Sequence, residues 1–288
     1  METIAGLLAT GAPLVLPGVY DALSARLAER AGFPAVFLSG YCLSATRLAR
    51  PDVGLLTQTE VVDTARGVAR AVGCPLVVDI DTGYGNPFNV ERTVTELIGA
   101  GVAGVFLEDQ VWPKRCGHMA GKRVVPLEEY LPKLRAALRA RGRTPFHVTA
   151  RTDARAAVSL DDALRRARAF ADAGADAVFV EAPESAAEMN AVRAAVPATV
   201  PLVANMVEEG KTPRRRAQEL AAAGFQIVTL PLGGLLAAAH ALADAYTVMR
   251  RDGATDALAG RRLRFDEMNT LLGLEEFYRR ERAWLDPT

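Results

Sequence analysis

The stretch Ala100-Gly-Val-Ala-Gly-Val-Phe-Leu-Glu108 decides the fold class, because it joins the end of a helical segment to a buried strand. Gly101 permits the left-handed backbone that ends many helices. The run from Val102 to Leu107 is almost wholly apolar, which is typical of a strand covered on both faces of a parallel sheet. The same unit recurs as AGFPAVFLS at 31–39, AGADAVFVE at 173–181 and AGFQIVTLP at 223–231.

Outward from these repeats, short apolar runs alternate with longer segments of helical period. The predicted strands are Leu14–Leu16, Ala35–Ser39, Leu76–Ile80, Gly104–Glu108, Phe146–Arg151, Ala177–Glu181, Leu202–Asn205 and Ile227–Leu230. The predicted helices are Ala22–Ala31, Gln58–Val72, Val90–Ala100, Leu127–Arg141, Leu160–Ala173, Ala186–Ala195, Arg214–Ala223 and Leu235–Arg250. Eight βα alternations predict an α/β fold, a (β/α)8 TIM barrel. A doubly wound open sheet is the alternative, disfavoured because no Gly-rich dinucleotide motif follows the first strand.

The length fits one large α/β domain or two small ones. Because no linker is evident, one domain over residues 1–288 is expected, with 261–284 left over as a C-terminal helical segment. The 34 basic and 34 acidic side chains cancel, so nucleic acid and anionic membranes are not expected partners. No apolar run reaches the roughly 20 residues of a membrane span, and no signal peptide is evident. Three cysteines leave one unpaired in any disulfide scheme, which favours a reducing cytoplasm.

Polar residues follow six of the predicted strands. In a TIM barrel these strand ends meet at the face that carries the active site. The residues are Ser39, Gly40, Tyr41, Asp79, Asp81, Glu108, Asp109, Arg151, Asp153, Glu181 and Asn205. Taken singly, Arg151 could be a buried ion-pair partner and Asn205 a helix cap. Their convergence on one face instead predicts a catalytic site.

Three of these residues are carboxylates that cannot all stay ionised close together without a cation. Asp79 and Asp81 are two apart on a predicted strand, so both should point to one face, with Glu108 next to them. Hard oxygen ligands suit Mg²⁺, with Mn²⁺ as the alternative ion; Zn²⁺ fits less well because no imidazole is offered. A general acid–base pair of the glycosidase kind is the other reading. Arg151 favours an anionic substrate, since a guanidinium binds carboxylates bidentately.

The loop Glu108-Asp-Gln-Val-Trp-Pro-Lys-Arg-Cys-Gly-His118 carries the remaining chemistry. Cys116 stands beside Lys114, Arg115 and His118, and a positive field favours a reactive thiolate. The alternative is a solvated loop with an incidental cysteine. Three other residues are expected to be structural: His147 in a strand, and Cys42 and Cys74 as small apolar side chains.

Ser39-Gly40, DIDTGYGN (79–86), LEDQVWPKRCGHMAGKRVVP (107–126) and ARTDAR (150–155), in that order, resemble the isocitrate lyase/phosphoenolpyruvate mutase superfamily. The likeness runs from LPGVYDALSA (16–25) to VANMVEEGKTP (203–213). The Lys-Arg-Cys-Gly-His motif is typical of the carbon–carbon lyase branch, which cleaves isocitrate, methylisocitrate or 2,3-dimethylmalate. Other segments look most like the 2-alkylmalate/oxaloacetate-cleaving group that includes the plant petal death protein.

The resemblance implies a role for each site residue. Asp79 would bind Mg²⁺, while Asp81 and Glu108 would hold its waters. Substrate would contact the set Ser39, Gly40, Tyr41, Asp52, Gly117, His118, Arg151 and Asn205. Glu181 would complete the catalytic set with Cys116 and Arg151, and the loop 110–123 would act as a lid. The family also exchanges a helix between subunits, so 261–284 is expected to pack on a neighbour in a homodimer or homotetramer.

The implied reaction is the cleavage of a 2-hydroxy dicarboxylate of the 2-alkylmalate or methylisocitrate type. The C2–C3 bond breaks to leave a 2-oxo acid, and Cys116 protonates the departing enediolate. Two departures from the family bear on the substrate. Tyr41 and Cys42 replace a run of glycines typical of methylisocitrate lyases, and Pro231 stands where oxaloacetate hydrolases typically have serine. Oxaloacetate hydrolysis, phosphonate rearrangement of the carboxyphosphonoenolpyruvate type and non-catalytic dicarboxylate binding remain the alternatives.

Overall fold

The computed structural model describes residues 2–117 and 121–285, which divide into two compact units. The first is Met1–Leu236 and the second Ala237–Thr288. The division falls within a helix and not at a linker, because α11 runs without interruption from Gly233 to Asp252. In the described residues, no helix combines the length and the apolar character needed to cross a membrane.

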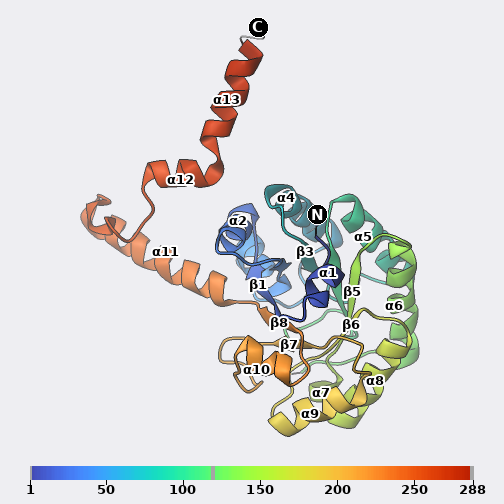
Figure 1. The fold of residues 1–288 in the computed structure, drawn as a ribbon. Coiled ribbons are helices and arrows are strands. Elements are labelled where there is room, and N and C mark those ends of the chain that lie inside the picture. The colour runs from blue at the N-terminus through green and yellow to red at the C-terminus, as the bar shows by residue number, and fades with distance from the viewer. Residues whose placement is uncertain (1, 118–120, 286–288) are drawn as a thin grey trace. The chain divides into compact units, whose positions relative to one another are not determined.

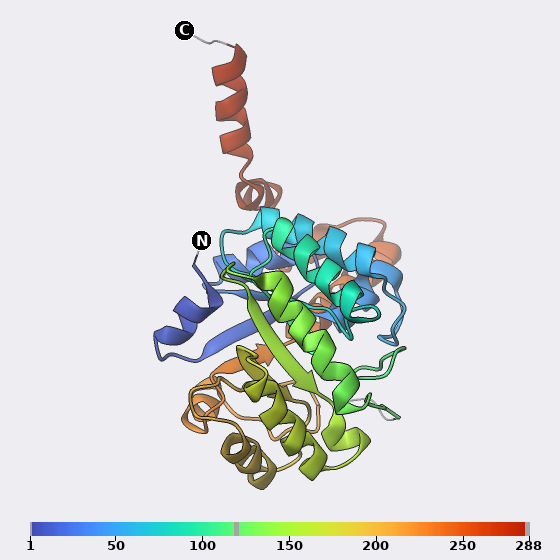
Figure 2. The same cartoon turned by 90° about the vertical axis from the view of Figure 1, so that its right-hand side faces the viewer.

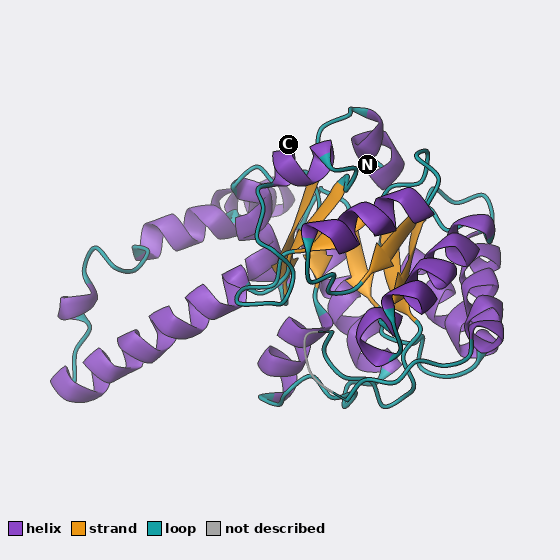
Figure 3. Cartoon of the chain, turned by 90° about the horizontal axis from the view of Figure 1, so that it is seen from below, coloured by secondary structure: helices purple, strands orange, loops and turns teal. Residues whose placement is uncertain are grey.

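Eight parallel strands form a barrel in the first unit, which confirms the predicted fold class (Figures 1 and 3). The strands are β1 Leu14–Val19, β2 Val36–Leu38, β3 Leu76–Asp79, β4 Gly104–Glu108, β5 His147–Thr152, β6 Ala177–Val180, β7 Val203–Asn205 and β8 Ile227–Leu230. Their order is β6-β5-β4-β3-β2-β1-β8-β7. A parallel bridge between Val178 and Leu202 brings β6 and β7 together and completes the ring.

Helices cover the outside of the barrel; α5 and α6 lie side by side there (Figures 1 and 2). The helical segments of the first unit are α1 Ile4–Ala9, α2 Ala22–Arg30, α3 Gly40–Leu43, the π-helical η1 Ser44–Leu48, α4 Gln58–Ala71, α5 Pro87–Gly99, α6 Leu127–Arg141, α7 Ala154–Ala157, α8 Leu160–Asp172, α9 Ala186–Ala195 and α10 Ala217–Ala222. Gly101 has φ +87° and Gly174 φ +91°, so the predicted left-handed helix ends are confirmed.

Several predicted boundaries differ from the observed ones by up to three residues; β1, for example, ends at Val19 and not at Leu16. The predicted strand Ala35–Ser39 is too long, because Ser39 is the N-cap of α3 and its hydroxyl accepts from the Cys42 N–H at 3.5 Å. Tyr41 is therefore helical. The short elements α1, α3, η1 and α7 were not predicted, since segments of four to six residues carry little periodic signal.

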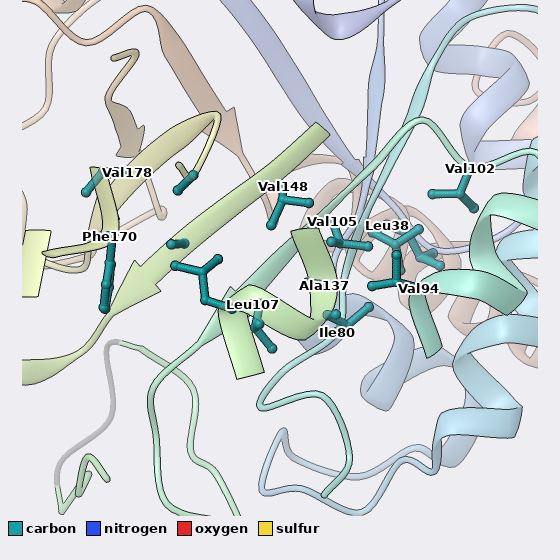
Figure 4. Packing of buried hydrophobic residues seen from close by; sticks show 14 of the residues in the cluster. Leu38, Ile80, Val94, Val102, Val105, Leu107, Ala137, Val148, Phe170 and Val178 are labelled. Carbon is teal, nitrogen blue, oxygen red and sulfur yellow. The ribbon is translucent and has the colours of Figure 1, made fainter. Parts of the chain in front are cut away.

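The apolar residues form two clusters, one between strands and helices and one inside the barrel. Figure 4 shows part of the outer cluster around Val105, Leu107 and Ala137. Inside the barrel, the rings of Phe37 and Phe106 have centroids 4.9 Å apart, and those of Phe106 and Phe179 are 5.9 Å apart. These rings come from alternate strands, as expected for a layered barrel interior.

The second unit consists of most of α11, the 3₁₀ turn η2 Asp256–Leu258, and helices α12 Phe265–Leu272 and α13 Leu274–Leu285. The last two confirm the helical reading of 261–284. Neither α12 nor α13 has a buried residue, although both carry large apolar side chains. Phe265 is 83% exposed, Phe277 62% and Trp284 71%.

Candidate active site

A pocket with a volume of about 40 Å³ opens at the carboxyl ends of the strands. It gathers most of the residues predicted for the site. The predicted residues that line it are Ser39, Tyr41, Asp52, Asp79, Glu108, Cys116, Gly117, Arg151, Glu181 and Asn205. Gly40 and Asp81 lie directly behind this lining. His118 lies outside the described residues.

Asp79 and Asp81 converge next to Gly40. A Cβ placed on Gly40 would lie 3.1 Å from Asp79 Oδ2 and 3.4 Å from Asp81 Oδ1, so only glycine leaves this cradle open. The convergence does not come from strand alternation, as predicted, because β3 ends at Asp79. Asp81 instead adopts a left-handed backbone with φ +48°, and its N–H donates to Asp79 Oδ1 at 3.1 Å. Such backbone strain in a non-glycine residue is typical of functional sites.

Burial makes the charged state of these acids costly. Burial raises the pKa of Asp81 to about 7, with nearby Asp79 and Asp52 adding to the rise while Lys114 opposes it. Burial likewise raises the pKa of Glu108 well above its usual range, although Arg151 offsets part of the effect. Glu108 Oε1 is buried and has no hydrogen-bond partner among the described atoms. An acceptor of this kind is suited to a cation or to water held by one.

This arrangement fits a hydrated divalent cation. Among the described residues, no three His, Cys, Asp or Glu side chains are placed to bind one ion directly. Mg²⁺ is commonly bound by one or two carboxylates and keeps several waters, which other acceptors can hold. The unpartnered oxygen of Glu108 and the open cradle beside Gly40 offer such places.

Lys114 contributes a contact that the sequence did not predict. Its ammonium lies 2.5 Å from Asp52 and 2.7 Å from Asp81, with all three side chains almost wholly buried. Burial opposes this charge, but Asp81 and Asp52 raise the pKa of Lys114 well above its ordinary value. The lysine therefore neutralises acids, and its field on Cys116 is weaker than the sequence suggested.

Arg151 forms ion pairs with three buried acids at the pocket. Its guanidinium lies 2.9 Å from Asp153, 3.1 Å from Glu181 and 3.4 Å from Glu108. It also stands 5.2 Å above the Phe179 ring centroid. Arg151 is therefore a buried ion-pair partner, as considered from the sequence. These ion pairs fix its guanidinium, and the residue still lines the pocket.

The described parts of the loop 110–123 are tied to the barrel near both ends of the loop. The Gln110 side chain bonds the backbone of Arg115 at 2.9 and 3.0 Å, and the Cys116 N–H donates to the Asp52 carbonyl at 3.3 Å. At the far end, the buried ammonium of Lys122 lies 2.6 Å from Asp153. Gly117 is so close that a Cβ there would lie 2.5 Å from Arg151.

Part of the pocket lining is apolar and was largely missed by sequence reasoning. Val207, Pro231 and Leu232 belong to it, and Cys42 Sγ lies 3.0 Å from the Pro231 carbonyl. Burial raises the pKa of Cys42 to about 12, so it remains a thiol and donates this bond. Apolar residues in loops give no periodic signal, and their place at the pocket depends on how the chain folds.

His147 has the structural environment that was expected for it. His147 is buried, and its Nε2 lies 3.0 Å from Thr149 Oγ1. Burial lowers its pKa to about 4, so the ring is neutral near pH 7.

Thr229, which also lines the pocket, was not singled out from the sequence.

Comparison with known proteins agrees with this geometry. Residues 4–250 match the family described as phosphoenolpyruvate phosphomutase. The chain is 44% identical to 2,3-dimethylmalate lyase of Eubacterium barkeri over 94% of this chain and 93% of that protein. It is 47% identical to the petal death protein of Dianthus caryophyllus, over 93% and 84% of the two chains.

Among solved structures, oxaloacetate acetylhydrolase bound to 3,3-difluorooxaloacetate superposes with a TM-score of 0.89 at 36% identity, covering 96% of this chain and 93% of that one. The barrel accords with this structural similarity. The chain therefore belongs to the phosphoenolpyruvate phosphomutase family, within the isocitrate lyase/phosphoenolpyruvate mutase superfamily.

Proposed function

We propose that this protein is a Mg²⁺-dependent carbon–carbon lyase that cleaves a 2-hydroxy dicarboxylate of the 2-alkylmalate type. One observation carries the proposal: the Cys116 thiol, the Arg151 guanidinium and the acids Asp79 and Glu108 all open into one pocket. A proton donor, an anion-binding cation and a cation-binding acid are the three groups that this reaction needs.

Asp79 would bind the ion directly, with Asp81 and Glu108 holding its waters. A bound Mg²⁺ would supply positive charge where the substrate oxygens become more negative. Arg151 would bind one substrate carboxylate, and its contacts with Asp153 and Glu181 orient it for that task. Mn²⁺ is the alternative ion for the same oxygen ligands.

The remaining predicted residues would bind substrate. Ser39 and Gly40 lie at the start of α3, where backbone N–H groups can donate to a second carboxylate. Tyr41, Asp52, Gly117, His118 and Asn205 would complete the enclosure. The Val207, Pro231 and Leu232 wall would receive the alkyl substituent, because burying a methyl group against apolar side chains is favourable.

The chemistry would then proceed in one cleavage. A pocket carboxylate accepts the proton of the C2 hydroxyl as that carbon becomes a carbonyl. The electrons of the C2–C3 bond pass to the departing carboxylate fragment as an enediolate. Cys116 Sγ–H protonates that fragment at carbon, which yields a 2-oxo acid and a second carboxylate. The lid excludes water while the enediolate exists.

A substrate panel tests the proposal and its main rival. Purified protein with Mg²⁺ is assayed for 2-oxo acid release from 2-alkylmalates, 2,3-dimethylmalate and methylisocitrate, and for oxalate release from oxaloacetate. We expect alkylmalates to be cleaved at least about tenfold more efficiently than oxaloacetate, since Pro231 offers no hydroxyl to an oxaloacetate-derived oxyanion. Efficient oxalate release would identify a hydrolase instead. Turnover of a phosphonate but no alkylmalate would favour the mutase alternative.

We also propose that the C-terminal segment 261–284 packs on a second copy of this chain, as a swapped element in a homodimer or homotetramer. Phe265, Phe277 and Trp284 expose more apolar surface than a solvated tail normally keeps. Exchange of one terminal element is a common route to such assemblies.

None of the three cysteines is in a disulfide, which supports a reducing cytoplasm as the compartment.

Deletion of residues 261–288 should lower the number of subunits in the assembly, as measured by analytical ultracentrifugation. In the full chain, Phe277→Glu with Trp284→Glu should do the same, because a charge on each apolar contact opposes association. Arg282→Glu in the same helix is the control and should leave the mass unchanged. If the deleted and wild-type proteins have the same number of subunits, the segment does not hold the assembly together.

A further inference from the structure

The floor of the pocket is one layer of the barrel interior, and one member of that layer is polar. Phe37 from β2, Phe106 from β4, Phe179 from β6 and Thr229 from β8 all line the pocket. They come from alternate strands, the arrangement typical of such layers. Thr229 is only 1% exposed, so its hydroxyl needs a partner within the protein.

The partner of that hydroxyl is Asn205, which faces Thr229 in the β7–β8 register. Thr229 Oγ1 donates to Asn205 Oδ1 at 2.7 Å. The Asn205 Nδ2 group therefore points the other way and donates to the two carboxylate oxygens of Glu181 at 3.2 and 3.4 Å. Glu181 in turn lies 3.1 Å from Arg151, so the contacts form one continuous relay from β8 to the guanidinium.

The relay has only one favourable orientation at Asn205. A reversed amide would set Oδ1 against the Glu181 carboxylate, where two acceptors repel each other, and Nδ2 against the Thr229 hydroxyl. The Glu181 carboxylate alone favours the observed orientation, and the Thr229 donor adds to that preference. An amide held this way keeps its Nδ2 group directed at Glu181, at the lining of the pocket.

We propose that Thr229 is a positioning residue for the reaction: it acts through Asn205, fixing the amide that orients Glu181 and that donates to substrate. The inference rests on the proposed function, since it assigns Asn205 to substrate binding. Thr229 need not react itself. Its hydroxyl is already committed to Asn205, and its loss leaves Asn205 Oδ1 as a buried acceptor without a donor.

Thr229→Val and Thr229→Ser test the assignment. Valine keeps the shape of threonine without the hydroxyl, and serine keeps the hydroxyl. Losing the donor to a buried acceptor should lower kcat/KM for the alkylmalate by roughly 5- to 100-fold in Thr229→Val. Thr229→Ser should stay within about threefold of wild type, because the donor returns. Thr149→Val is the matched control: a buried barrel threonine on β5, bonded to His147, that does not line the pocket.

Calorimetric binding of oxalate with Mg²⁺ gives a second readout that does not depend on turnover. Thr229→Val should weaken oxalate binding while Thr149→Val does not. Equal effects of these two valine variants, or a loss in Thr229→Ser as large as in Thr229→Val, would overturn the positioning role. A wild-type protein that binds oxalate but cleaves no alkylmalate would overturn the proposed function alone; Thr229 would then be judged by the oxalate affinities.

Discussion

Cys116→Ser should lower lyase turnover by about 10²- to 10⁴-fold, the range that a positioned proton donor contributes. Serine keeps nearly the same size but holds its proton far more tightly than a thiol, so protonation of the enediolate fails while the pocket stays intact. Substrate affinity should change little, so kcat and kcat/KM should fall together. Steady-state kinetics on the best alkylmalate, with oxalate affinity from calorimetry, measure both quantities.

The matched control is Cys74→Ser. Cys74 is a half-buried thiol outside the pocket, and burial raises its pKa to about 11. Its replacement should leave turnover unchanged. Alkylation adds an independent check, since substrate with Mg²⁺ should slow the reaction of Cys116 with iodoacetamide by closing the lid. Near-normal lyase activity in Cys116→Ser would remove the cysteine from the mechanism and show that another group protonates the enediolate.

Asp79→Ala should reduce turnover by roughly 10³-fold or more, because the loss of a direct ligand removes several kcal/mol of transition-state stabilisation. Asp79 lies at the end of β3 in the Gly40 cradle, the place proposed for the direct ligand. Calorimetric titration with Mg²⁺ should show the binding isotherm lost together with activity.

Asp63→Ala is the control for this variant, since Asp63 is an exposed acid of α4 paired with Arg66. It should leave both Mg²⁺ affinity and turnover as in wild type. If Asp79→Ala binds Mg²⁺ normally, or if wild type stays active in excess chelator, the metal assignment is wrong.

The sequence alone predicted the barrel because its signal is local and repeated. Gly104–Glu108 and Leu127–Arg141 have the predicted bounds, and Gly101 and Gly174 have the predicted left-handed φ. Strand ends are also local features. A polar residue that directly follows an apolar run must reach the carboxyl face of a parallel barrel, so the convergence of Asp79, Glu108 and Arg151 on one pocket followed from the repeat.

Contacts between distant segments could not be predicted in this way. Lys114 was expected to act on Cys116, but its ammonium pairs with both Asp52 and Asp81. These acids are 62 and 33 positions away from Lys114 along the chain, and only the fold brings the three side chains together. Asp81 reaches the acid cluster through a strained turn and not through strand alternation. Each of these outcomes depends on which segments of the chain the fold brings together.

The same limit applies to the pocket's apolar wall and to Thr229. Val207 and Leu232 lie in loops, where neither period nor composition marks a residue as facing a pocket. Thr229 sits in an apolar strand, and only the β7–β8 register places its hydroxyl 2.7 Å from Asn205. The sequence by itself determined the elements, their order and the acids and bases at the strand ends, because these depend on neighbours along the chain. The tertiary structure alone decided which charges neutralise each other and which groups orient the reactive ones, because a hydrogen bond or ion pair depends on ångström distances between segments far apart in sequence.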